Sequence, residues 1–194
     1  MIIGITGGIG SGKSTIAGQL REMGYTVYDT DSEAKRLIIE DPHVREQIEQ
    51  LFGKEVYQDG VYQTALVAQL VFADKSMLAQ LNAIVHPAVR ADILRWSTAP
   101  HNQSPNNLLF VECAILYQTK IDTLCDKVVL VTAPEEVRLA RVIARDHTTI
   151  DKVRARMRAQ EIDKDLQRAD IVIDNAGILP IRALCEDLLQ LIYQ

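Results

Sequence analysis

The chain has 194 residues, of which 47% are hydrophobic and 24% are charged, and its formal net charge at pH 7 is -5. This length suits one globular core with room for an inserted lobe, while the acidic balance argues against a nucleic-acid partner and no apolar run is long enough to span a membrane. Cys113, Cys125 and Cys185 lie far apart in the sequence, so we expect them to be buried free thiols. The apolar start has no basic residues before it, so we expect no signal peptide and a cytoplasmic location.

The chain opens with a short apolar strand at residues 1–6, a glycine-rich loop and an amphipathic helix at residues 14–23. The loop, Gly7-Gly8-Ile9-Gly10-Ser11-Gly12-Lys13-Ser14-Thr15, fits the phosphate-binding pattern G-x-x-x-x-G-K-[ST]. Its glycines let backbone N–H groups converge on an anion at the start of the helix. We expect Lys13 to reach the terminal phosphates of a nucleotide and Ser14 to bind Mg²⁺. A turn that merely links strand to helix is the alternative.

A second strand is expected at residues 25–28, and it ends in Asp29-Thr30-Asp31. Open α/β sheets bind ligands beyond the carboxyl ends of their strands, so a carboxylate here could accept a proton from a hydroxyl or shape the Mg²⁺ site. The two aspartates would point to the same side if the backbone stays extended. Either could instead cap a helix that begins near Ser32.

Residues 32–97 are expected to be mostly helical, without clear strands, because aliphatic residues recur there at spacings of three and four. Asp41-Pro42 opens a helix and Asp59-Gly60 marks a turn. A stretch this long exceeds a simple crossover, so we expect an inserted lobe for a second substrate. His86-Pro87 predicts the start of a new helix. His86 could bind a phosphate or ribose oxygen, or could make a structural hydrogen bond at a helix boundary.

A third strand at residues 108–111 is a continuous apolar run, typical of a central parallel strand, and Glu112 closes it. This carboxylate could act through Mg²⁺-bound water or could be an ordinary charge at a strand end. A fourth strand follows at residues 127–131. A helix then begins near Pro134, with two glutamates in its first turn that favour the helix dipole.

Six arginines lie on two predicted helices that meet near residues 148–151, where the sequence resembles a capping box. They are Arg138, Arg141, Arg145, Arg154, Arg156 and Arg158. Spacings of three and four put the first three on one helix face. The set could form a lid whose guanidinium groups clamp a triphosphate, or it could be solvated and paired with nearby carboxylates. We do not expect all six to be functional.

A fifth strand at residues 169–174 and an amphipathic helix at residues 178–192 complete the chain. The alternation, with a helix after each of the last three strands, predicts an α/β fold with a five-stranded, doubly wound parallel sheet and helices on both faces. We expect a single domain of the P-loop kinase type with three subregions. They are a nucleotide-binding core (1–31, 108–140 and 169–194), a helical acceptor lobe (32–100) and a helical lid (141–166).

Two function classes use such a phosphate loop. A small-molecule kinase fits the inserted lobe and the arginine lid, because closure excludes water from phosphoryl transfer. A GTPase or ATPase switch is the other class. Residues 174–177 match its D-x-x-G motif and residues 119–122 echo its guanine motif, but they come in the wrong chain order. We therefore expect a kinase.

Several further motifs follow one another over nearly the whole chain. They are residues 5–14, Asp29-x-Asp31, Asp59-Gly60 ahead of Leu66 and Val71-Phe72, Leu81-Asn82-Ala83-Ile84-Val85-His86-Pro87, Arg141 and Arg145 with Gln160, and Ala169-Asp170-x-Val172-Ile173-Asp174-Asn175-x-Gly177. In these motifs the chain resembles the dephospho-CoA kinase family. The phosphate loop is shared with many kinases, whereas the segment ending in His86-Pro87 and the last motif are more selective.

The resemblance implies ATP-dependent, Mg²⁺-assisted phosphorylation of the ribose 3′-hydroxyl of dephospho-CoA to coenzyme A, with another nucleotide or nucleoside acceptor as the alternative. It implies small-molecule partners only, ATP and dephospho-CoA, and we expect a monomer or a weak homo-oligomer. The roles it carries over are Asp31, Lys13 and Arg141 in catalysis, Asp31 and His86 at the acceptor, Ser14 at the metal, and Gly8, Ile9, Gly10, Ser11, Gly12, Lys13, Ser14, Thr15, Arg145 and Asn175 at ATP. Asn175 would lie near the adenine.

Two positions depart from the family pattern. Thr64 stands where the family usually has an arginine after the Asp-Gly turn, and Gln118 stands where a segment after the third strand carries a glutamate. Both departures concern the binding of the acceptor, and neither affects the phosphate loop or Asp31.

Overall fold

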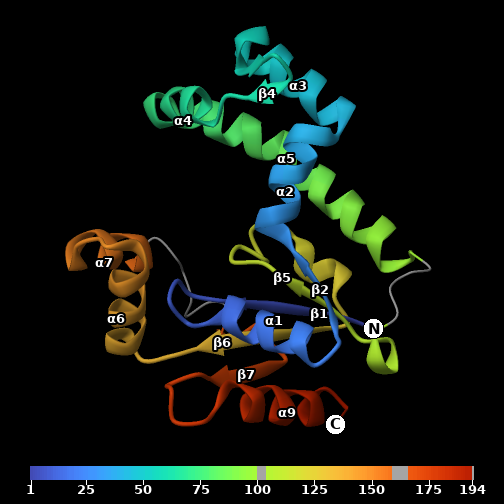
Figure 1. Cartoon of the computed structure of the whole chain (residues 1–194), viewed down its shortest axis with the longest axis vertical. Helices are drawn as coiled ribbons and strands as arrows, with labels where there is room; N and C mark the ends of the chain where they lie inside the picture. The colour runs from blue at the N-terminus through green and yellow to red at the C-terminus, as the bar shows by residue number, and fades with distance from the viewer. Residues whose placement is uncertain (100–103, 159–165, 194) are drawn as a thin grey trace. The chain divides into compact units, whose positions relative to one another are not determined.

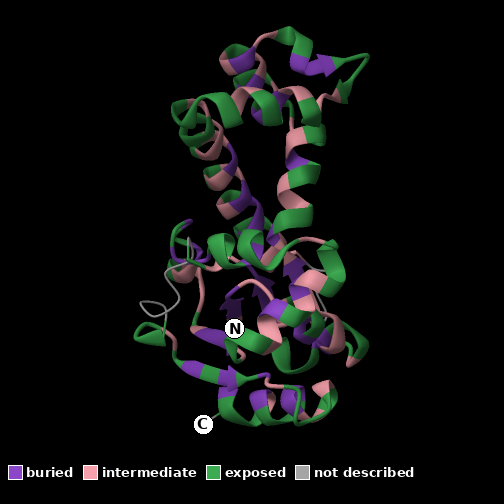
Figure 2. Ribbon diagram, turned by 90° about the vertical axis from the view of Figure 1, so that its left-hand side faces the viewer, coloured by how far each residue is buried: buried purple, intermediate pink, exposed green. Residues whose placement is uncertain are grey.

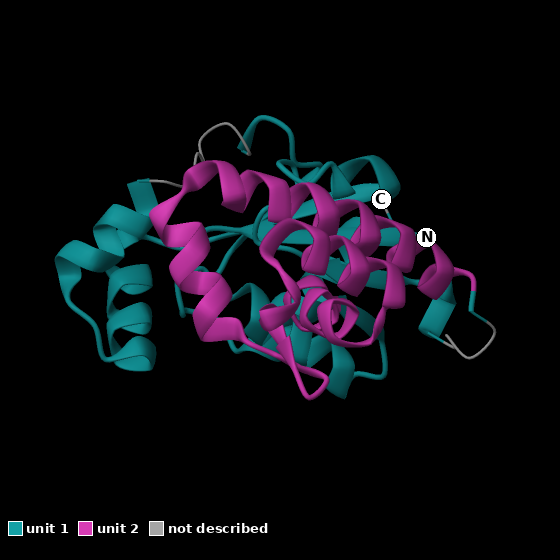
Figure 3. Cartoon of the chain, turned by 90° about the horizontal axis from the view of Figure 1, so that it is seen from above, with its two compact units in different colours: residues 1–28, 99–194 teal, residues 29–98 magenta. Residues whose placement is uncertain are grey.

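A computed structural model of the chain describes residues 1–99, 104–158 and 166–193. The chain divides into two compact units, which Figure 3 shows in different colours: unit 1 is Met1–Tyr28 with Ala99–Gln194, and unit 2 is Asp29–Thr98. None of the helices that the structure describes is long and apolar enough to cross a membrane.

Unit 1 is built on a five-stranded sheet in the order β2-β5-β1-β6-β7 (Figure 1). Its strands are β1 (Ile2–Gly7), β2 (Thr26–Asp29), β5 (Leu109–Glu112), β6 (Lys127–Thr132) and β7 (Ile171–Asp174). β1 pairs in parallel with both β5 and β6, and β6 pairs in parallel with β7. The predicted parallel α/β sheet and all five of its strands are confirmed.

The apolar runs that predicted the strands form the core of unit 1. The residues of β1, β5 and β6 are almost all buried, which Figure 2 shows in purple. Helices α1 (Lys13–Glu22) and α9 (Ile181–Ile192) lie side by side and add Leu20 and Leu188 to the same core. Because β1 is the central strand, the loop that follows it is held by buried neighbours on both sides.

The segment between β5 and β6 differs from the prediction of a helix there. It contains turns and one short 3₁₀ helix, η3 (Ile121–Leu124). Thr119 donates its hydroxyl to the carbonyls of Ile115 and Leu116, and Lys120 has a positive φ of 57° that ends the turn. A side chain that bonds to backbone carbonyls competes with the regular helix.

The other helices described in unit 1 lie before β5 and after β6. η2 (Pro105–Asn107) precedes β5, and α6 (Glu135–Asp146) and α7 (Ile150–Arg158) follow β6. Leu139 and Val142 of α6 pack against Val153 of α7, and Ile9 of the phosphate loop joins this cluster. The base of the arginine-bearing helix pair is therefore a packed extension of the loop.

Unit 2 is helical and has a core of its own. It contains α2 (Thr30–Glu40), α3 (Pro42–Phe52), η1 (Lys54–Val56), α4 (Thr64–Ala73) and α5 (Lys75–Ser97). Ile48, Val56 and Val67 are among the buried residues of this core. The expectation of no strands was wrong, since β3 (Tyr57–Gln58) and β4 (Val61–Tyr62) form an antiparallel hairpin. Its turn is the predicted Asp59-Gly60, where both residues have positive φ, as a two-residue hairpin requires.

The prediction of a new helix at His86-Pro87 was also wrong. α5 runs without interruption from Lys75 to Ser97 and contains Pro87. Proline at this position leaves the carbonyl of Ala83 without its helical donor. Val85, Val89 and Ile93 are buried on both sides of the proline, so packing holds the two halves in one helix.

Candidate active site

The phosphate loop turns sharply between β1 and α1. Ser11 N donates to Gly8 O at 3.1 Å, and Gly12 is the N-cap of α1 with φ 95° and ψ 22°. Gly10 is tightly enclosed, because a Cβ there would lie 2.5 Å from the carbonyl oxygen of Arg138. Only glycine fits both positions, and the backbone N–H groups that open α1 stay available to an anion.

Two polar side chains of the loop, Lys13 and Ser14, make hydrogen bonds in the structure. The Lys13 ammonium group donates to Gly8 O at 3.5 Å. The hydroxyl of Ser14 donates to Oε1 of Glu112 at 2.6 Å. Glu112 ends β5, and β5 pairs directly with β1, so the strand register carries this carboxylate to the loop.

Sequence reasoning left two alternatives open for Glu112, a role through Mg²⁺-bound water and an ordinary charge at a strand end, and did not include it among the predicted site residues. The sequence did place this carboxylate at the carboxyl end of a predicted strand, which is where α/β sheets bind ligands. The sequence does not say which strand lies next to β1, and that neighbour decides whether the carboxylate reaches the phosphate loop. Glu112 is buried, with 8% of its surface exposed, which is unusual for a simple strand-end charge.

Five of the six arginines of the helix pair fall into two groups according to their partners. Arg138 donates from Nε to Ile9 O at 2.9 Å, and Arg141 donates from Nη1 to Gly10 O and Ser11 O, each at 3.4 Å. Both support the outer backbone of the phosphate loop. Arg141 remains our prediction for a catalytic arginine.

The other group makes surface ion pairs. Arg145 bonds to Asp146 at 2.7 Å, Arg156 bonds to Asp146 at 3.1 Å, and Arg154 bonds to Glu135 at 3.4 Å. The hydrogen bond from Arg145 holds the pKa of the Asp146 carboxyl below its ordinary value. These side chains make the pairs that the solvated alternative predicted, and an ATP contact by Arg145 stays a prediction. Gln160 lies outside the described residues.

Asn175 supports the loop from the side of β7. Its side chain is 1% exposed, and its Nδ2 donates to Ser11 O at 2.9 Å. Its backbone N donates to Thr132 O at 2.8 Å, which fixes its position just after β7. A Cβ on Gly12 would overlap this Nδ2. The amide therefore packs against the loop, and its expected place near the adenine stays a prediction.

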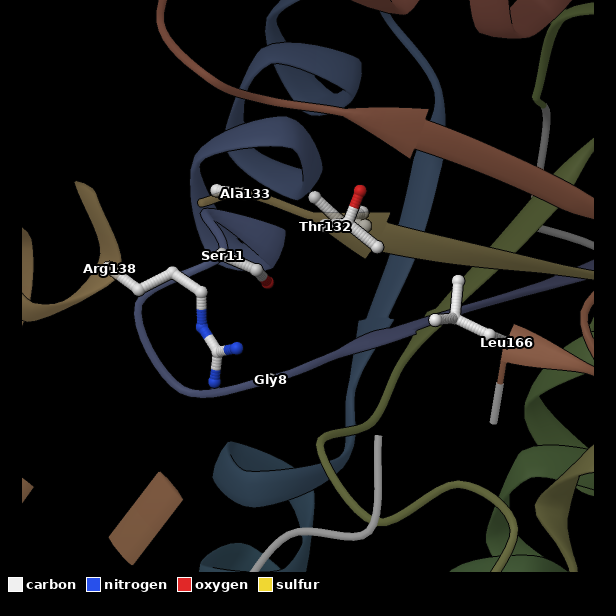
Figure 4. Close-up of a pocket in the computed structure, with 7 residues that line it drawn as sticks. Gly8, Ser11, Thr132, Ala133, Arg138 and Leu166 are labelled. Atoms are coloured by element: carbon white, nitrogen blue, oxygen red, sulfur yellow. The ribbon is translucent and has the colours of Figure 1, made fainter. Parts of the chain in front are cut away.

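A cavity of about 190 Å³ opens beside the loop. Figure 4 shows Arg138 reaching from α6 toward Gly8 and Ser11, with Thr132 and Leu166 on the other sides. Ser11 is completely buried, and its hydroxyl makes no hydrogen bond to the described residues. The same holds for Nη2 of Arg138. The cavity is therefore lined by buried donors without acceptors.

Asp31 and His86 belong to unit 2. Asp29, not Asp31, is the N-cap of α2, and its Oδ1 accepts from the backbone N of Asp31 and of Ser32. Asp31 thus lies in the first turn of α2, with an exposed side chain that is not used as the cap. His86 lies inside α5, and partial burial lowers its pKa below the ordinary value. Its acceptor role stays a prediction.

The two departures from the family pattern also lie on the described chain. Thr64 is the first residue of α4 in unit 2. Gln118 is an exposed turn residue of unit 1, after β5.

Comparison with known proteins gives one consistent result. The family model described as dephospho-CoA kinase matches residues 1–180. A dephospho-CoA kinase from Porphyromonas gingivalis is 39% identical over 167 residues, which cover 86% of this chain and 81% of the relative.

Solved structures agree. A crystal structure of TT1252 from Thermus thermophilus is 36% identical with a TM-score of 0.79, covering 100% of this chain and 96% of the other. The dephospho-CoA kinase from Campylobacter jejuni is 25% identical with a TM-score of 0.73, covering 98% of this chain and 96% of the other.

Proposed function

This chain belongs to the dephospho-CoA kinase family, and on that premise we propose how its residues transfer the terminal phosphoryl group of ATP to the ribose 3′-hydroxyl of dephospho-CoA. The enzyme is a phosphotransferase with an alcohol acceptor, and its products are coenzyme A and ADP, the last step of coenzyme A biosynthesis. The observation that carries this conclusion is the phosphate loop with its Ser14–Glu112 pair, set in a chain that matches the family over residues 1–180.

The phosphate loop binds ATP. Its backbone N–H groups, from Gly8 to Thr15, hold the phosphates at the start of α1. The ammonium group of Lys13 binds the oxygens of the terminal phosphates. Arg141 lies against the loop at Gly10 and Ser11, where its guanidinium stabilises the charge that develops during transfer. Arg145 and Asn175 complete the nucleotide site.

The residues at the loop fit Mg²⁺. Mg²⁺ prefers oxygen ligands and is commonly held by one or two carboxylates together with substrate phosphates. The hydroxyl of Ser14 and the carboxylate of Glu112 are 2.6 Å apart and supply such oxygens. Ser14 would bind the metal and Glu112 would orient it, directly or through water. When bound, the ion neutralises phosphate charge.

Asp31 acts on the acceptor. It takes the proton of the ribose 3′-hydroxyl as the oxygen attacks the terminal phosphorus, and the bond from that phosphorus to the oxygen of ADP breaks. The support for this role is the family motif Asp29-x-Asp31, together with the cap formed by Asp29, which leaves the Asp31 carboxylate available. His86 binds the acceptor from the middle of α5. We place the reaction in the cytoplasm, with small molecules as the only partners.

The test is ADP formation from Mg·ATP by the purified protein with dephospho-CoA, AMP, adenosine or no acceptor, and with Lys13→Ala as the control variant. We expect ADP only with dephospho-CoA, a product whose mass is increased by one phosphate on the 3′-oxygen, and almost no turnover by the variant. Turnover with AMP or adenosine but not with dephospho-CoA would overturn the acceptor and leave the ATP site standing.

A further inference from the structure

Arg138 is held in an unusual way beside the phosphate loop. Its Nε donates to Ile9 O at 2.9 Å, whereas Nη2 is buried and makes no hydrogen bond to the described residues. Nη2 belongs to the side chain that lines the cavity with Gly8, Ser11 and Thr132 (Figure 4). Arg138 is not one of the residues that carry the family resemblance, so its role has to come from this geometry.

Arg138 makes no ion pair with a carboxylate of the described residues. Burial lowers the pKa of its guanidinium, and the charge of Glu135 opposes this shift. The Glu135 carboxylate bonds to Arg154 instead. Burying an arginine is costly unless a partner of opposite charge completes its hydrogen bonds. The cavity therefore suits an oxyanion.

The position of the cavity indicates which part of a nucleotide would use it. Lys13 donates to Gly8 O, and the lysine of a phosphate loop reaches the outermost phosphates. Gly8 therefore marks the terminal-phosphate end of the loop. Gly8 also lines the cavity that holds Arg138, together with the hydroxyl of Ser11, which is completely buried and has no acceptor among the described residues.

We propose that Arg138 is a further phosphate-binding residue, which contacts the terminal phosphoryl group of bound ATP through Nη2 while Nε keeps its bond to Ile9. The planar guanidinium can make both bonds at once, which a lysine cannot. The contact would distinguish ATP from ADP, because ADP lacks the group that fills the cavity. This inference rests on the proposed function only in that ATP binds at the loop.

The test measures the binding of Mg·ATP and of Mg·ADP to nucleotide-free protein by calorimetry. For Arg138→Gln we expect the dissociation constant of ATP to rise about 10- to 100-fold, as for the loss of a charge-assisted hydrogen bond, and that of ADP to rise less than about threefold. Arg138→Lys should fall between wild type and Arg138→Gln. Arg182→Gln is the matched control, because Arg182 makes a surface pair with Glu186 on α9.

An equal loss of ATP and ADP affinity would overturn the inference, since it would mean that Arg138 only braces Ile9. No loss of either would overturn it as well. If Arg138→Gln does not fold, Arg138→Lys supplies the same comparison. Turnover of dephospho-CoA by the wild type is measured alongside. If the wild type does not phosphorylate dephospho-CoA, the proposed function is refuted, and the ratio of the ATP and ADP dissociation constants still tests the role of Arg138. If that ratio is the same in Arg138→Gln and in the wild type, the role of Arg138 is refuted even if coenzyme A forms.

Discussion

The contact between Gly12 and Asn175 predicts a strong energetic coupling. Gly12→Ala places an L-residue at φ 95°, a left-handed strain of about 1–2 kcal/mol. Its methyl group also overlaps Nδ2 of Asn175, which is 1% exposed and bonded to Ser11 O. The amide can move away only by breaking that bond, which leaves its own buried N–H without a partner at about 1–3 kcal/mol, while Ser11 O keeps the bond from Arg141 at 3.4 Å. We expect Gly12→Ala to lower the free energy of unfolding by about 2–5 kcal/mol.

A double-mutant cycle isolates the contact. Asn175→Ala alone loses the same hydrogen bond and should cost about 1–3 kcal/mol. The double variant loses that bond once, not twice, and keeps only the backbone strain. Its loss of stability should therefore fall short of the sum of the single losses by about 1–3 kcal/mol, in the range measured for residues in direct contact.

The assay is urea unfolding of the nucleotide-free protein, followed by circular dichroism and extrapolated linearly to zero denaturant. Nucleotide is left out because bound ligand adds its own stabilisation. Additivity of the two substitutions within about 0.5 kcal/mol would refute the reasoning, since distant, independent residues behave in that way.

Three further predictions concern the chemistry and the pH dependence. Asp31→Asn should lower kcat by about 10²- to 10⁴-fold and leave ATP binding by calorimetry nearly unchanged, as for a lost general base; a small change in kcat would mean that positioning alone carries the reaction. Glu112→Gln should raise the Mg²⁺ concentration for half-maximal activity by about 10- to 100-fold, and an unchanged Mg²⁺ titration would exclude the carboxylate from the metal site. Burial lowers the pKa of His86 below its ordinary value of 6.5. As the pH falls, the unfolded chain therefore binds a proton at this histidine before the folded protein does. Stability that is fully present above pH 6.5 is lost as the pH falls to the lower pKa of the folded protein. Urea unfolding across this pH range should show that the free energy of unfolding falls less steeply with decreasing pH in His86→Gln than in His43→Gln. Equal pH dependence in the two variants would mean that His86 does not contribute to this loss of stability.

The sheet and the phosphate loop could be predicted because their signals are local. Each central strand is a continuous apolar run, and the glycine pattern with Lys13 and Ser14 directly follows one of them. The hairpin in unit 2 escaped prediction because its strands have only two residues each, too few to show a period of two. The prediction of a new helix at Pro87 failed although the local signal is strong. Proline does disfavour helix at the residue before it, but the packing of buried valines on both sides outweighs this preference.

The site was less predictable than the fold, because tertiary pairing decides it. Helical spacing put Arg138, Arg141 and Arg145 on one face, and spacing cannot separate them. The structure separates them by their neighbours, since Arg145 meets the carboxylate of Asp146 and the other two meet carbonyls of the phosphate loop. Glu112 shows the same limit, because strand order places it against Ser14.

Unit 2 is a single uninterrupted stretch of chain, and this has a consequence for how such an enzyme can evolve. Among the described residues, the loop, strand and arginine contacts that we assign to the ATP site lie in unit 1, before residue 29 or after residue 98. Recombination at two points, near residues 28 and 98, would exchange the whole acceptor lobe that we propose and would leave unchanged four residues that bond to the phosphate loop, which are Glu112, Arg138, Arg141 and Asn175. Specificity for the acceptor can therefore drift while selection keeps the phosphate donor site unchanged, and new substrates can be acquired by replacing one contiguous block of the gene.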